Sequence, residues 1–156
     1  MTESNGRKVL SERKLNAIRR VLNVDAHHDA SGGGADFTAR LYGRYLTEAL
    51  AHCAECHSGR DLFGGIRAGQ RYAGGPDPEG RGWVPNITAK GLGSWSKSDV
   101  SELLGSGFTP DFDSVGSSMA DVVKNMAALP KADRDAMAEY LKSLPAVDGP
   151  PKPAKK

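Results

Sequence analysis

This sequence has few of the residues that build a large hydrophobic core. Aromatic residues make up 6% and hydrophobic residues 38% of its 156 positions, which is below the usual share for a soluble domain. Glycine and proline are plentiful, with 19 and 9 copies. A core made of side chains alone would therefore be thin, and a large bound group is one way to supply the missing apolar volume.

Other absences exclude whole classes of protein. The sequence has no apolar run of roughly 18 residues, so it predicts no transmembrane helix. The net charge of +2 is too small to indicate nucleic-acid binding by itself. Residues 1–30 carry charges throughout and lack the apolar segment of a signal peptide. Only two cysteines are present, which excludes the disulfide framework of small secreted domains.

The spacing of apolar residues predicts a helical protein with loops rich in glycine. Helices are expected near residues 10–24, 35–52, 96–104, 117–128 and 130–144. No segment alternates with a period of two, so no β-sheet is expected. We divide the chain into a basic helical extension with a Gly-rich linker (1–36), one domain (37–147) and a disordered tail rich in proline and lysine (148–156).

Two of the expected helices carry detailed patterns. In the second helix, one apolar face is formed by residues spaced four apart and their neighbours, namely Phe37, Leu41, Tyr45, Leu46, Ala49 and Leu50. The third helix begins with a capping box from Ser96 to Asp99 and stops at Gly105 and Gly107. Between these two helices, residues 58–95 hold ten glycines and form a long loop region, and such a loop usually has a functional reason.

One motif carries specific chemistry. Residues 53–57 read Cys-Ala-Glu-Cys-His, which is the C-x-x-C-H signature of haem attachment. The thiols of Cys53 and Cys56 are spaced so that each can add to one vinyl group of the same haem. The imidazole of His57 then lies under the porphyrin plane, where it can bind iron.

Two other interpretations of the cysteine pair are weaker. A thioredoxin-like redox site has its C-x-x-C after a strand in a βαβ unit, whereas this pair follows a helix. A zinc site needs further ligands at a matching spacing, and His27, His28 and His52 do not provide a second pair.

Several residues are candidates for the second iron ligand. Met126 and Met137 fit core packing, and His27 and His28 fit solvent exposure. Met119 follows a Gly/Ser-rich turn, from which a loop can bring its sulfur to the iron, and we favour it. The alternative for Met119 is to cap a hydrophobic pocket.

With the motif in view, residues 43–144 resemble a haem domain of the class I cytochrome c superfamily. The resemblance is closest to single domains of the di-haem and multi-haem cytochromes c that serve membrane-bound dehydrogenases. The matching stretches are 43–46, 56–60 with 64–65, 84–88, 91–96, the segment around Met119, and 129–130 leading to 138–145.

The resemblance implies an all-α, cytochrome c-like fold of four to five helices, with long Gly-rich loops around one covalently bound haem. It implies that Gly43 and Tyr45 meet Tyr140 and Leu141 where the first and last helices of the domain cross. It also makes Met119 the distal iron ligand.

Two further residues near the haem have roles that the resemblance implies. Trp95 would lie near a haem propionate, and plain core packing is an equal alternative. The Pro85 carbonyl would accept the N–H of the His57 ring and so orient it.

The expected function is electron transfer by a mono-haem c-type cytochrome, which is an electron carrier and not an enzyme. Electrons would come from a dehydrogenase and pass to a cytochrome or oxidase of a respiratory chain. A periplasmic location is expected because the family receives its haem outside the cytoplasmic membrane. Membrane association would be peripheral, through a partner complex. Four arginines of the loop region either steer an acidic partner or form an ordinary solvated face, namely Arg60, Arg67, Arg71 and Arg81.

The main rival function is a gas-binding or peroxidase-like haem protein with an open iron position. A thiol–disulfide module without haem is the second rival.

Overall fold

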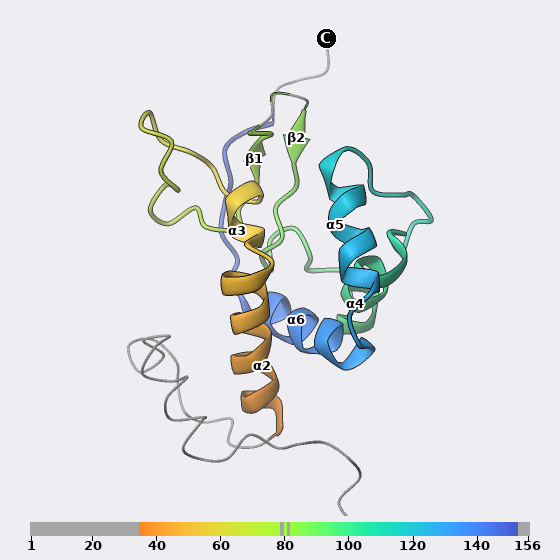
Figure 1. Cartoon of the computed structure of the whole chain (residues 1–156). Helices are drawn as coiled ribbons and strands as arrows, with labels where there is room; N and C mark the ends of the chain where they lie inside the picture. Colours follow the sequence, from red (N-terminus) through yellow and green to blue (C-terminus); the bar gives the residue numbers. More distant parts are fainter. Residues whose placement is uncertain (1–34, 79, 81, 153–156) are drawn as a thin grey trace, which may run out of the picture. The chain divides into compact units, whose positions relative to one another are not determined.

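The computed structural model describes residues 35–78, 80 and 82–152, and the helix expected over 10–24 lies outside these ranges. The described part is mainly helical, which confirms the all-α prediction (Figure 1). Its helices are α2 (Ala35–Tyr45), the π-helix η2 (Leu46–Leu50), α3 (Cys53–Cys56), α4 (Lys97–Ser106), α5 (Ser118–Ala127) and α6 (Lys131–Ser143). None of the described helices has the length and apolarity that crossing a bilayer requires.

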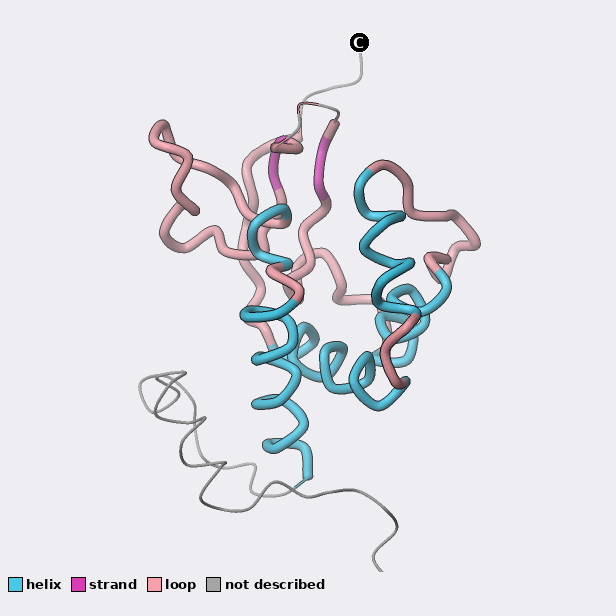
Figure 2. Tube along the Cα trace, in the orientation of Figure 1, coloured by secondary structure: helices cyan, strands magenta, loops and turns pink. Residues whose placement is uncertain are grey.

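The expectation that the chain has no β-structure is wrong in one small respect. Strands β1 (Gly75–Pro76) and β2 (Trp83–Val84) pair antiparallel, with Gly75 opposite Val84. Two residues are too short to show an alternating pattern, so the spacing of apolar residues carries no signal for them. Figure 2 shows that these strands interrupt the long loop region between α3 and α4.

Helices α2 and α6 cross at the base of the domain in Figure 1, and a glycine allows the crossing. A Cβ atom added at Gly43 would lie 1.8 Å from the carbonyl oxygen of Ala136 on α6. The two backbones therefore approach more closely than any side chain at this position permits. The resemblance placed Gly43 at this crossing, and the structure agrees, but Gly43 meets Ala136 and not the expected Tyr140 or Leu141.

The π-helix changes which residues face the core. Leu46 and Thr47 are buried, whereas Tyr45 and Leu50 are exposed at 39% and 58%. The extra residue in a π turn rotates the following side chains relative to an α-helix. The prediction that Ala49 and Leu50 face the core is therefore wrong. It is also wrong for Tyr45, which precedes the π-helix, whereas Leu41 and Leu46 are buried as predicted.

Helix α4 begins as its sequence predicts. The Ser96 hydroxyl accepts a hydrogen bond from the Asp99 amide (3.1 Å), and the Asp99 carboxylate accepts one from the Ser96 amide (2.7 Å). These two bonds are the predicted capping box, and each satisfies an N–H that the helix itself cannot bond. The helix ends at Ser106, and the next residue, Gly107, has the left-handed conformation (φ +81°) that glycine adopts without strain. The other predicted stop, Gly105, lies within the helix.

The main hydrophobic core is small. Seven buried residues form it, and Met137 is among them at 1% exposure, which confirms its predicted packing role. Nine apolar residues around them are only partly buried: Tyr42, Ala51, Cys53, Ile87, Trp95, Met119, Met126, Leu129 and Leu144. The domain thus offers apolar surface that its own side chains do not cover completely.

The segment after α6 returns along the loop region. The Val147 carbonyl accepts a hydrogen bond from the Asn86 side chain (2.8 Å), and the Val147 amide donates to the Thr88 hydroxyl (3.2 Å). A Cβ at Gly149 would meet the carbonyl oxygen of Ala73 at 2.0 Å. The start of the segment that we assigned to a disordered tail, 148–150, therefore lies against the domain, held by contacts that composition does not reveal.

We predict that Gly43→Ala destabilises the protein by about 1–3 kcal/mol, because the new methyl group forces α2 away from α6. Denaturant unfolding of the purified chain measures this loss. Gly116→Ala is the matched control, since a Cβ at Gly116 meets nothing within 4 Å. Equal stabilities of the two variants would contradict the close crossing.

Candidate functional site

The C-x-x-C-H motif occupies a single helical turn. Helix α3 runs from Cys53 to Cys56, and His57 follows at its C-terminal end. The residue before the helix, His52, has the left-handed conformation (φ +52°), which turns the chain sharply after η2. Cys53 is partly buried, Cys56 is exposed, and both thiols are free. The site therefore presents two unbonded sulfur atoms at neighbouring positions beside an imidazole.

The imidazole of His57 is buried and fixed. Its Nδ1 atom lies 2.9 Å from the carbonyl oxygen of Pro85, as the resemblance implied for this pair. Burial lowers the pKa of His57, although the bond to Pro85 opposes this shift, so the ring is neutral at neutral pH. A neutral ring that donates from Nδ1 keeps its free electron pair on Nε2, where a metal ion can bind.

Further bonds fasten the loop around this histidine. The amide of Gly74 donates to the His57 carbonyl (2.8 Å), and the Ser58 hydroxyl accepts from the Tyr72 amide (3.0 Å). The Tyr72 carbonyl in turn accepts from the Ile87 amide (2.9 Å). His57 thus lies between two loop segments that are bonded both to it and to each other.

The chemistry of Cys53 disfavours a thiol–disulfide site. Burial raises the pKa of the Cys53 thiol to about 11, although it stands at a helix N-terminus, where reactive thiols have lowered values. The described residues also contain no group of three or more His, Cys, Asp or Glu side chains that can hold a metal ion. Neither the thioredoxin-like nor the zinc interpretation gains support from this geometry.

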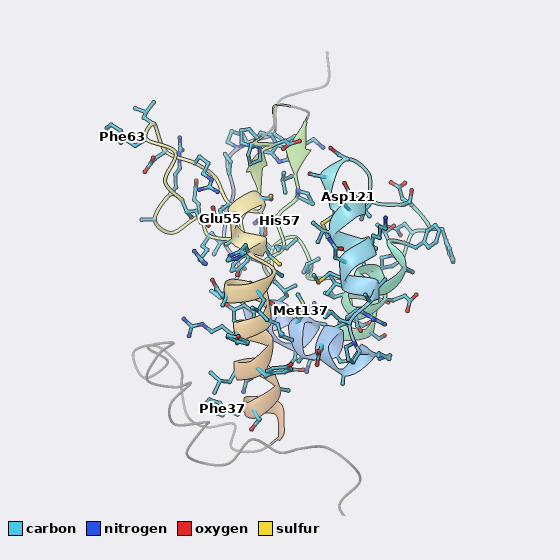
Figure 3. The ribbon with its side chains drawn as sticks, in the orientation of Figure 1. Phe37, Glu55, His57, Phe63, Asp121 and Met137 are labelled. Carbon is cyan, nitrogen blue, oxygen red and sulfur yellow. The ribbon has the colours of Figure 1, made fainter. Side chains whose placement is uncertain are left out.

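The helix expected near residues 117–128 forms as α5, so Met119 does not reach the site from a loop as the ligand argument assumed. Met119 is the second residue of α5 and not a loop residue, although it does follow the Gly/Ser-rich turn at 115–117. Met119 and Cys53 both pack against the main core cluster, and so do Met126 and Trp95. Figure 3 shows His57 at the end of α3, in the region between that helix and α5. Met119 and Cys53 therefore pack against the same apolar cluster, and His57 follows the second cysteine at the end of α3.

The loop arginines are bonded within the domain. Arg60 pairs with Glu55 (2.6 Å), Arg71 pairs with Glu48, and Arg67 donates to the Arg60 carbonyl (2.8 Å). Arg81 lies outside the described residues. The charges of Arg60 and Arg71 are therefore already paired within the domain, without an acidic partner protein. Glu48, which pairs with Arg71, also accepts a hydrogen bond from Tyr140, and the sequence did not indicate this grouping.

Comparison with known proteins adds the family. Over 107 residues the chain is 56% identical to a diheme cytochrome c-type protein of Cereibacter sphaeroides, a match that covers 68% of this chain and 36% of that protein. The fructose dehydrogenase cytochrome subunit of Gluconobacter japonicus is 36% identical over 107 residues, which are 67% of this chain and 22% of that subunit. No family model matches the chain.

The described residues form a cytochrome c domain. It resembles the domains of dehydrogenase cytochrome subunits. One further relative is the cytochrome c subunit of alcohol dehydrogenase (quinone) of Gluconobacter oxydans, which is 37% identical to the chain over 115 residues. That match covers 67% of this chain and 24% of the subunit. The chain thus spans about a third or less of the length of these relatives. The donor set and the partly covered apolar surface of the cytochrome c domain both fit a haem.

We predict that Gly74→Ala loosens the contact between His57 and Pro85. A Cβ at Gly74 would lie 2.7 Å from the Val84 carbonyl oxygen, so the new methyl group pushes the β2 segment outward. The expected loss of stability beyond that of the control is about 1–3 kcal/mol. Faster solvent exchange of the His57 ring N–H, followed by NMR, reports the loosened bond.

Gly69→Ala is the control for that experiment. Gly69 has nearly the same positive φ (+76° against +75°), but a Cβ there meets nothing within 4 Å. The control therefore carries the backbone strain without the clash. Identical exchange rates of the His57 ring N–H in the two variants would contradict the role of Gly74 in holding Pro85 against His57.

Proposed function

We propose that this cytochrome c domain carries single electrons through one covalently bound haem c. Cys53 and Cys56 form the two thioether links, and His57 provides the proximal iron ligand through Nε2. The observation that supports this most directly is the buried His57 ring, because its Nδ1–Pro85 bond orients Nε2 away from the loop. The two free thiols at the required spacing complete the attachment site.

Met119 is the proposed second ligand. Its position in the first turn of α5 and its packing beside the same cluster as Cys53 support this choice over the fully buried Met137. Trp95, half-buried against the same cluster, is proposed to contact the haem and to donate its indole N–H to a propionate.

The haem supplies the change between two iron oxidation states, and the protein determines how easily that change occurs. Pro85 makes the His57 ring a stronger donor by accepting its N–H. The apolar residues around the core exclude water from the ligand side. The exposed Cys56 places one edge of the attachment site at the surface, where an electron can leave or enter.

The partners follow from the relatives. We propose a dehydrogenase as the electron donor, since several relatives are named as cytochrome subunits of such enzymes. A cytochrome or oxidase is the proposed acceptor, and any membrane association is peripheral, through the complex. Covalent attachment of haem c takes place outside the cytoplasmic membrane, so we also propose a periplasmic location.

The rival function, a gas-binding or peroxidase-like haem protein, requires an open iron position. The absorption spectrum of the matured protein separates the two functions. Six-coordinate, low-spin haem supports electron transfer, and five-coordinate, high-spin haem in the unmodified protein would contradict it.

We predict that Met119→Ala converts the haem from six-coordinate, low-spin to five-coordinate, high-spin, because the thioether is lost. Absorption and resonance Raman spectra measure the change. Met126→Ala is the matched control, since Met126 lies on the same helix and packs against the same cluster. A spin-state change in the control alone would assign the ligand to Met126.

A further inference from the structure

A cluster of polar and aromatic side chains lies beside the attachment motif. It consists of Glu48, Arg71, Tyr72 and Tyr140, and we call it the Glu48 cluster. The Tyr140 hydroxyl donates a 2.6 Å hydrogen bond to one carboxylate oxygen of Glu48, and Arg71 forms an ion pair with the other oxygen. The guanidinium of Arg71 also lies over the Tyr72 ring, 5.4 Å from its centre. The carboxylate of Glu48 is therefore held from both sides.

The cluster joins three distant segments at the motif. Glu48 lies on η2, Arg71 and Tyr72 belong to the loop, and Tyr140 belongs to α6. The two tyrosine rings pack edge to face with centres 6.4 Å apart, and both are buried. Together with Ala54 they form the second core cluster, against which Cys53 packs. Tyr140 thus contacts Glu48 through its hydroxyl and belongs to the cluster that holds Cys53.

Glu48 differs from the other carboxylate near the motif in its exposure. The Glu48 side chain is 18% exposed, whereas that of Glu55, between the two cysteines, is 58% exposed. Burial alone would raise the pKa of Glu48, but the bonds from Arg71 and Tyr140 outweigh it and lower the pKa. Glu48 is therefore a negative charge that persists at neutral pH in a place where water screens it poorly.

We propose that Glu48, oriented by Tyr140 and Arg71, is a positioning residue that lowers the reduction potential of the haem attached at Cys53. This inference rests on the proposed function. Oxidised haem carries one more positive charge than reduced haem, so a nearby carboxylate stabilises the oxidised state. Arg71 acts in the opposite direction and limits the effect, since it leaves the ion pair nearly neutral as a whole.

Screening decides which carboxylate matters. The interaction between two charges is about fourfold larger at an effective dielectric constant near 20 than at the value of about 80 in bulk water. The largely buried Glu48 is in the environment of lower dielectric constant, and the exposed Glu55 is close to bulk water. Both are paired with an arginine, so loss of either carboxylate leaves one unpaired guanidinium. The two sites therefore differ in exposure and in the hydrogen bond that Glu48 accepts from Tyr140.

The test is potentiometric titration of matured, haem-loaded protein at about pH 8, well above ordinary carboxyl pKa values. Glu48→Gln is expected to raise the reduction potential, by several times the shift of the control Glu55→Gln. Arg71→Gln is expected to lower the potential, and the double variant E48Q/R71Q to return towards the wild-type value. Unchanged ligand-sensitive absorption bands show that the iron ligands are retained.

Two results would overturn the inference: equal shifts for Glu48→Gln and Glu55→Gln, or a lower potential for Glu48→Gln. If Glu48→Gln does not mature, Arg71→Gln decides. A lowered potential then supports the inference, and an unchanged or raised potential refutes it. Failure of the proposed function is a separate result, since the wild-type protein would then contain no covalent haem to titrate.

Discussion

The hydrogen bond between the His57 ring and the Pro85 carbonyl joins residues that are 28 positions apart, and the arrangement of the site depends on it. It fixes the orientation of a buried imidazole and closes the Gly-rich region into a loop. The bonds from Gly74 to His57 and from Tyr72 to Ser58 reinforce the closure from inside. A loop of this length with little regular structure is therefore ordered by its attachment to the histidine.

Local signals in the sequence predicted much of the fold. The capping box at Ser96 and Asp99 involves neighbours only, and it forms as expected. The crossing at Gly43 and the contact between Pro85 and His57 were available through the resemblance, since both belong to a family pattern. The motif at 53–57 predicts, from five consecutive residues, where the haem is attached.

The features that the sequence did not predict depend on long-range or cooperative effects. The π-helix leaves Leu50 exposed although the spacing of apolar residues placed it on the core face, and nothing in the local spacing distinguishes a π turn from an α turn. The Glu48–Arg71 and Glu48–Tyr140 bonds span 23 and 92 positions, so they become visible only when η2, the loop and α6 are assembled. Met119 was expected to reach the iron from a loop, although the helix predicted over 117–128 includes it; the start of α5 has no side-chain cap that would mark it in the sequence.

A covalently bound haem would explain both the small hydrophobic core and the residues of the attachment motif. Partly buried apolar residues surround a small core, and they include both Cys53 of the motif and Met119. A covalently bound haem would cover this surface and so contribute to folding as well as to electron transfer. The Glu48 cluster would then place a largely buried carboxylate beside the attachment motif.

The intact mass of the protein, matured with the haem-attachment machinery, tests the central claim most directly. We expect a mass equal to that of the chain plus one haem that resists extraction by acid and organic solvent. We also expect that neither Cys53 nor Cys56 reacts with an alkylating reagent. An unmodified mass with both thiols reactive would contradict covalent attachment of a haem at this motif.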